Sequence, residues 1–152
     1  MILKLKMSKY KLFLIPLILF SIMASGQHNI TWDTLAQVNF SEKFFPAYGE
    51  KFLYPEFLAP IKSLEGKQVT ITGYFLNINP DENQYILSKG PMSSCFFCGV
   101  GGPETAVELQ FSEKPNFKTD DIVQVTGRLK LNADDVEHFN YILTQCKAQR
   151  VN

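Results

Sequence analysis

The chain has 152 residues, with 15 lysines and arginines, 15 aspartates and glutamates and two histidines, so its formal net charge is zero. Its arginines are Arg128 and Arg150 alone. This balance argues against nucleic-acid binding, because that affinity comes mostly from lysine and arginine side chains that neutralise phosphates.

The first predicted element is a cleavable export signal at residues 1–26. Four lysines precede an apolar run from Leu12 to Ala24, which is too short to span a bilayer of about 20 apolar residues as a helix. Ala24 and Gly26 supply the small residues that signal peptidase needs, so cleavage is predicted between Gly26 and Gln27. An uncleaved membrane anchor is the alternative.

Cleavage predicts a periplasmic protein of residues 27–152 without a membrane span. Removing the four lysines leaves 11 basic and 15 acidic groups, a formal net charge of −4. A chain of this length forms one domain with a core that does not depend on disulfides.

Residues 27–60 are predicted to form an aromatic N-terminal arm. Pro46, Gly49, Pro55 and Pro60 predict that no long helix or strand forms after the first helical turn. Because aromatic side chains mostly serve burial, we expect the arm to cover an apolar surface of the protein. Its aromatic residues are Trp32, Phe40, Phe44, Phe45, Tyr48, Phe52, Tyr54 and Phe57.

Residues 61–152 are predicted to be an all-β domain of five strands. Alternation of apolar and polar residues places the strands near 67–79, 84–89, 105–111, 121–132 and 138–146. Gly73 and Gly127 occupy matching places in the first and fourth strands, where glycine is typical of a bulge or of tight coiling. The pattern favours a five-stranded OB-like Greek-key barrel over a sandwich.

Several strand motifs of this chain resemble those of a known protein family. "LEGKQVTITGYFLNI", "YILSKGPMSSCFFCGVGGPETAVELQF", "DIVQVTGRLKL" and "YILTQC" are similar to a family of small exported bacterial proteins of unknown function. The similarity covers roughly 30–146. It implies an OB-like fold. Some members are encoded beside metal-uptake ABC systems, which implies a role in handling a metal, most often suggested to be zinc. Many relatives have a histidine and a proline run in the loop where this chain has Cys98 and "GVGGPE".

The loop "SSCFFCGVGG" carries the most specific motif. Cys95, Cys98 and Gly99 have the spacing of a zinc knuckle, in which both sulfurs face one ion and the glycine takes a positive φ. Structural zinc needs four ligands. Cys146 is predicted as the third, and His28, His138, Glu104 or water would supply the fourth.

Two other states of the thiols compete with metal binding. Cysteines of an exported protein oxidise, so Cys95 could form a disulfide with Cys98 or with Cys146. Thiol exchange needs a helix that begins at Cys95 and lowers the thiol pKa, and the glycines and Pro103 that follow disfavour one.

Chemistry elsewhere in the chain is sparse. His138 follows the acidic turn "NADDVEH", which is typical of a solvated hairpin, and Glu104 and Glu108 are not expected to converge. The sequence shows no nucleophile elbow, phosphate loop or paired metal-ligating histidines, so no cofactor other than zinc is predicted.

The sequence therefore predicts a non-enzymatic, periplasmic, OB-like binding or accessory protein. Its functional surface is the loop 93–104 with Cys146 nearby, and zinc handling is the specific role that the resemblance implies. The alternative is a disulfide-stapled interaction module that docks on an envelope protein or transport complex through the aromatic arm, Phe96 and Phe97. A thiol–disulfide oxidoreductase is the third hypothesis.

Overall fold

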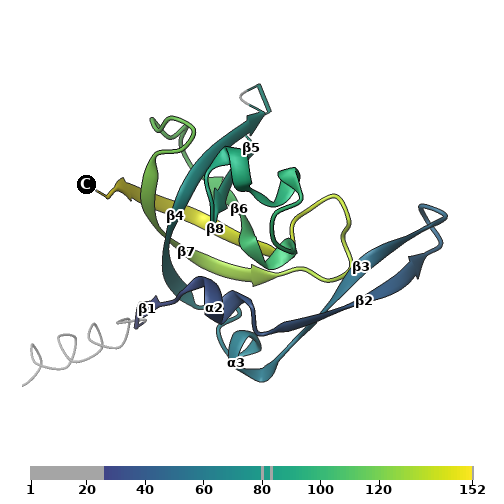
Figure 1. Ribbon diagram of the computed structural model, residues 1–152. Helices are drawn as coiled ribbons and strands as arrows, with labels where there is room; N and C mark the ends of the chain where they lie inside the picture. Colours follow the sequence, from purple (N-terminus) through teal and green to yellow (C-terminus); the bar gives the residue numbers. More distant parts are fainter. Residues whose placement is uncertain (1–25, 80, 83, 152) are drawn as a thin grey trace, which may run out of the picture.

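The computed structural model describes residues 26–79, 81–82 and 84–151, and the predicted export signal lies outside them except for Gly26. Within these ranges, no helix is both long enough and apolar enough to cross a membrane. Figure 1 shows a coiled β-barrel from which a hairpin projects. The elements are β1 (His28–Asn29), α2 (Trp32–Leu35), β2 (Val38–Phe45), β3 (Glu50–Phe57), α3 (Ala59–Lys62), β4 (Gln68–Asn79), β5 (Gln84–Ser88), η2 (Met92–Ser94), η3 (Phe96–Cys98), η4 (Pro103–Thr105), β6 (Ala106–Phe111), β7 (Ile122–Leu131) and β8 (Tyr141–Arg150).

Five strands close the barrel. Strand β4 pairs with β5, β5 with β6, β6 with β8, β8 with β7, and β7 pairs again with β4. All of these pairs are antiparallel except β6 with β8, which is parallel. The prediction of an all-β, five-stranded OB-like barrel is confirmed.

Strand β4 changes partner midway, and this change depends on Gly73. Residues 68–74 of β4 pair with β7, and residues from 74 onward pair with β5. A Cβ atom at Gly73 would lie 2.6 Å from the Ser88 carbonyl oxygen and 2.7 Å from the Trp32 ring. Only glycine lets these groups approach the strand so closely, as expected for tight coiling.

Gly127 marks the second predicted irregularity. The register of β7 with β8 shifts between Thr126 and Arg128, which is a β-bulge. On β8, Gln145 takes the left-handed conformation with φ 54°. A Cβ atom at Gly127 would lie 3.0 Å from the Thr144 carbonyl oxygen, so the bend also requires close approach.

Two apolar clusters stabilise the fold. The larger fills the barrel and includes Phe75, Tyr85, Val125 and Leu143. The smaller lies on the outer side of β4, β5 and β6, where the loop after β5 covers the strands. Its buried members are Leu76, Ile86, Cys95 and Ala106.

The N-terminal segment differs from the prediction. Instead of an arm without long elements, β2 and β3 form an antiparallel hairpin of two eight-residue strands. Pro46 and Gly49 lie in its turn, and Pro55 lies within β3 opposite Phe40. A two-stranded sheet tolerates this proline because each strand has an outer edge where no ladder N–H is needed.

The two ends of the hairpin meet different surroundings. At its base, Phe57 is buried against the Tyr141 ring, with centroids 5.5 Å apart, and α3 buries Ile61. The Tyr141 hydroxyl donates to the Leu35 carbonyl at 2.6 Å, and burial raises its pKa. Toward the tip, Phe44 and Tyr48 are exposed. The expected covering of apolar surface therefore holds for the base of the hairpin only.

Candidate functional site

The cysteine loop joins β5 to β6 and is folded by three short 3₁₀ turns. Backbone bonds close it at its ends, where the Lys89 N–H donates to the Thr105 carbonyl at 3.0 Å. The Met92 N–H donates to the Asp120 carboxylate at 2.7 Å, which ties the loop to the segment before β7. The loop is therefore held on the outer face of the barrel rather than projecting freely.

Within this loop, the structure brings Cys95 and Cys98 together. Their Sγ atoms are 4.0 Å apart, and both cysteines are free thiols. Cys95 is 2% exposed, whereas Cys98 is exposed and its thiol donates to the Met92 carbonyl at 3.1 Å. Two thiolates of a tetrahedral zinc site lie about 3.8 Å apart for zinc–sulfur bonds of about 2.3 Å, so this separation suits one ion.

Gly99 ends the turn as the motif requires. Its φ is +77°, the left-handed conformation that favours glycine, and its N–H donates to the Phe96 carbonyl at 2.9 Å. The turn η3 that follows Cys95 has three residues. It is not the long helix that a thioredoxin-like site uses to lower a thiol pKa.

Cys146 lies elsewhere. It belongs to the cluster inside the barrel, whereas Cys95 belongs to the cluster outside it. Burial raises the pKa of the Cys146 thiol to about 12, and this thiol donates to the Leu143 carbonyl at 3.0 Å. In the described part of the chain, no three histidine, cysteine, aspartate or glutamate side chains gather as metal ligands. Of the three predicted zinc ligands, the structure therefore brings Cys95 and Cys98 together and leaves Cys146 apart.

The other loop residues have mainly local contacts. Phe96 is partly buried and packs on the cluster around Cys95, while the Phe97 side chain lies outside the described part of the structure. The Glu104 carboxylate accepts from the Gly102 N–H at 3.3 Å. These contacts make Glu104 a turn residue in this structure.

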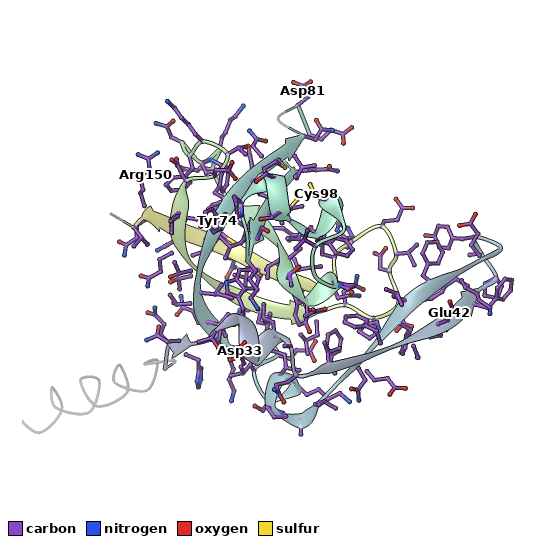
Figure 2. All side chains as sticks on the ribbon, viewed as in Figure 1. Asp33, Glu42, Tyr74, Asp81, Cys98 and Arg150 are labelled. Atoms are coloured by element: carbon purple, nitrogen blue, oxygen red, sulfur yellow. The ribbon has the colours of Figure 1, made fainter. Side chains whose placement is uncertain are left out.

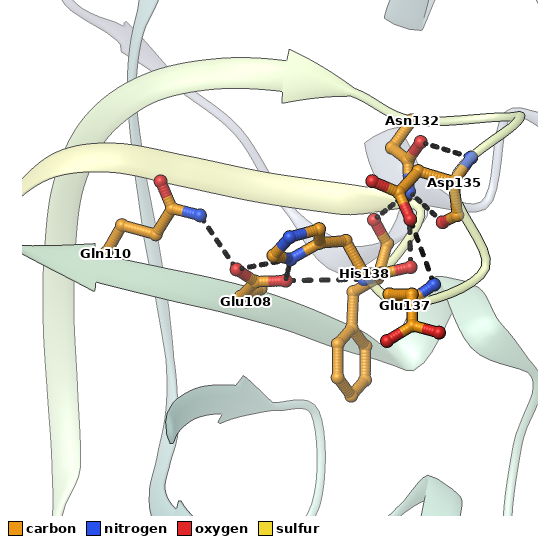
Figure 3. A network of polar contacts seen from close by, with 7 residues as sticks. Glu108, Gln110, Asn132, Asp135, Glu137 and His138 are labelled. Carbon is orange, nitrogen blue, oxygen red and sulfur yellow. Dashed lines mark hydrogen bonds and ion pairs between the residues drawn. The ribbon is translucent and has the colours of Figure 1, made fainter. Parts of the chain in front are cut away.

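A groove of about 610 Å³ lies across β5 and β6, and the sequence did not indicate it. Glu108 on β6 is its organising side chain. Its two carboxylate oxygens lie 3.1 and 2.9 Å from His138 Nδ1, and it accepts from the Gln110 amide at 2.8 Å (Figure 3). The hydrogen bond and charge of Glu108 raise the pKa of His138, which stabilises the imidazolium.

The loop between β7 and β8 forms one wall of this groove and has a fixed shape. The Asn132 amide donates to the carbonyls of Asp135, His138 and Phe139 at 2.7, 3.2 and 3.2 Å. Its carboxamide oxygen accepts from the Asp135 N–H at 3.1 Å (Figure 3). The buried Asn132 side chain therefore holds the loop that joins the ends of β7 and β8.

On the other side of the same loop lies a cleft of about 370 Å³. The hairpin, the loop at 133–140 and the cysteine loop each contribute to it. Figure 2 shows the projecting hairpin with its side chains, Glu42 among them, and Cys98 on the barrel. The lining residues are Phe45, Phe52, Leu53, Phe96, Pro103, Ala133, Asp135, Val136, Glu137, His138, Phe139 and Asn140.

Sequence reasoning found the cysteine pair but missed the convergence of Glu108 with His138. The parallel pairing of β6 with β8 brings these residues together, since Glu108 lies opposite Ile142 and the loop turns back from there. Parallel pairing of the third and fifth strands accompanies an OB-like barrel. The predicted fold could therefore have indicated that Glu108 and His138 lie close together.

Neither the scan against family models nor the search of curated proteins finds a match for this chain.

Proposed function

We propose that this chain is an exported, non-enzymatic, OB-like binding protein of the bacterial envelope that handles zinc through Cys95 and Cys98. The single observation that carries the proposal is the 4.0 Å separation of the two Sγ atoms, followed by Gly99 in the left-handed conformation. The resemblance to small exported proteins, some of them encoded beside metal-uptake systems, supports the same role.

Two protein thiolates supply half of a tetrahedral zinc shell. Water or a second molecule would supply the remaining ligands, because Cys146 is buried in the other cluster and its high pKa keeps it protonated. The exposure of Cys98 leaves the open side of the site accessible. Such a shell suits a protein that accepts and passes on an ion more than one that holds it as a structural element.

Zinc titration of the reduced protein, purified from the periplasm of an expression host, tests the proposal. Bound zinc should approach one ion per chain, and its affinity should fall at acid pH because protons compete for the thiolates. Cys95→Ser and Cys98→Ser should each remove the binding. The matched control is Cys146→Ala, which should keep it. Equal zinc affinity in Cys98→Ser would contradict the assignment.

Thiol counting on the unreduced sample addresses the stapled alternative. If Cys95 and Cys98 form a disulfide in the envelope, alkylation of the denatured, unreduced chain will label one thiol, and the folded protein will take up zinc only after reduction. Three labelled thiols with no zinc uptake would exclude both states of the pair. The intact mass of the same sample checks the proposed periplasmic location, because cleavage after Gly26 leaves a chain that begins at Gln27.

A protein-interaction module is the second candidate. It is favoured by the hairpin β2–β3, on which Phe44 and Leu53 remain more than half exposed although they are large apolar side chains. Exposed apolar side chains that cluster on one element are typical of a contact surface. This candidate does not depend on zinc.

A further inference from the structure

We propose that the cleft between the hairpin β2–β3 and the loop Asn132–Asn140 binds a basic, extended segment of a partner polypeptide. A bulky apolar side chain of that segment fills the cleft, and its lysine or arginine neighbours face the carboxylates around the loop. The inference goes beyond zinc handling and stands on a different part of the molecule.

The inner walls of the cleft are apolar and come from three elements. Phe45 and Phe52 belong to the hairpin and share one of its faces, Phe96 belongs to the cysteine loop, and Val136 to the loop after β7. The rings of Phe45 and Phe52 meet edge to face at 5.6 Å. A hollow of about 370 Å³ lies within the range of about 300–1,000 Å³ that is typical of ligand pockets. An aliphatic or aromatic side chain suits these walls.

The charges of the cleft favour a basic partner. Asp135 and Glu137 are its ionised side chains besides His138, and His138 pairs with Glu108 at 2.9 Å. The groove on the other side of the loop adds Glu82 and Glu113 against one lysine, Lys114. Lysine and arginine would gain attraction here, whereas phosphate groups of nucleic acid or anionic lipid would be repelled.

The two hollows favour a polypeptide over a small molecule. Glu137, His138 and Phe139 line both the cleft and the groove, so the hollows meet along one loop. One is mainly apolar and the other carries most of the carboxylates. A chain in extended conformation alternates its side chains and can present both kinds of group to such a surface.

The walls are held in place before any partner arrives. Lys43 on the hairpin pairs with Asp134 on the loop at 3.0 Å, and its ammonium lies 3.8 Å from the centre of the Tyr54 ring. Asn132 fixes the loop from inside through the bonds to Asp135 and His138. A site that is already ordered costs little conformational entropy on binding.

Fluorescence anisotropy with labelled peptides tests the inference on the periplasmic protein. The probe is a synthetic decapeptide in which lysine alternates with leucine and phenylalanine. One comparison peptide has glutamate for lysine, and another has alanine for leucine and phenylalanine. We expect each replacement to weaken binding at least about tenfold, which corresponds to about 1.4 kcal/mol.

Variants then locate the site. Phe52→Ser in the cleft and Glu137→Lys on its rim should each weaken binding of the lysine peptide about tenfold or more. The matched controls are Phe44→Ser, more exposed on the same hairpin but outside the lining, and Glu50→Lys, a charge reversal on that hairpin outside the lining. Both controls should bind as the unaltered protein does, with circular dichroism confirming that all four variants are folded.

Three outcomes would overturn the inference. These are equal losses in Phe52→Ser and Phe44→Ser, equal affinity for the lysine and glutamate peptides, and binding to phosphatidylglycerol vesicles without binding to the lysine peptide. The last outcome would assign the hairpin to a membrane surface. Cys98→Ser separates the two proposals, because it should abolish zinc uptake and leave peptide binding unchanged.

Discussion

The barrel and the hairpin use the same kinds of residue under opposite constraints. In the barrel every strand has a partner on both sides, and Phe75, Tyr85 and Tyr141 are buried. In the hairpin each strand is paired on one side in the described structure, and Phe44 and Tyr48 are exposed. Closure of the sheet therefore decides whether an aromatic side chain stabilises the fold or is available for contact. Substitutions in the barrel should change stability, and substitutions near the hairpin tip should not.

The largest effect is expected from Gly73→Val. A side chain there would meet the Ser88 carbonyl oxygen and the Trp32 ring, which cannot both move away, so unfolding free energy should fall by about 3 kcal/mol. Gly127→Val, with its nearest contact at 3.0 Å, should cost less. Urea unfolding followed by circular dichroism measures both. Unchanged midpoints would refute the role of close strand approach in the barrel.

Tyr141→Phe should have the next largest effect. It removes the hydroxyl that donates to the Leu35 carbonyl and leaves a buried acceptor unsatisfied, at a cost of about 1–2 kcal/mol. Tyr48→Phe on the exposed part of the hairpin is the matched control and should be neutral. If the two substitutions had equal effects, the barrel and hairpin would not differ as the comparison requires.

A smaller effect is expected from pH through His138. The pKa of His138 is raised above its ordinary value of 6.5, so its pair with Glu108 contributes stability fully below pH 6.5. That contribution is lost as pH rises through the higher pKa of the folded protein. Because the His138 side chain is 46% exposed, solvent screening limits the effect to ~0.5 kcal/mol. An NMR titration should show the His138 pKa falling in Glu108→Gln, and an unchanged pKa would exclude the pair.

The smallest effect is expected from Phe44→Ser. Phe44 is 55% exposed, so little apolar surface leaves water when the hairpin folds around it. The unfolding free energy should change by less than about 0.5 kcal/mol. Thermal unfolding measures the change, and a loss comparable to that of Tyr141→Phe would mean that the hairpin tip is part of the core.

The barrel could be predicted from the sequence because local features indicate it: the alternation of apolar and polar residues along each strand, and the two glycines Gly73 and Gly127. Val69, Ile71 and Phe75 point into the barrel and are all buried, while Thr72 and Tyr74 between them are exposed or partly exposed. Gly73 and Gly127 then identified the places where coiling and bulging occur. These features follow from steric rules that act within one strand and its immediate partner.

The hairpin was missed because its prolines were interpreted without knowledge of the sheet's width. Pro55 would disrupt a central strand but is tolerated in a sheet of two strands. The pairing of Glu108 with His138 was missed for a related reason, since it depends on strands that meet only when the barrel closes. The Cys95–Cys98 pair was accessible because its geometry is set within one turn.

The pairing of β4 with β7, which closes the barrel, also has a consequence for the order in which the chain folds. This pairing joins residues far apart in the sequence, such as Gln68 and Arg128. The pairing within the hairpin joins residues close in the sequence, such as Phe45 and Glu50. Local hairpins form in about 1–10 μs, and pairings between distant segments are slower because a long loop must first be closed. Trp32, which donates to the Thr72 carbonyl at 2.9 Å, reaches its place only with β4. In a folding chain the aromatic hairpin is therefore expected to form before the barrel closes.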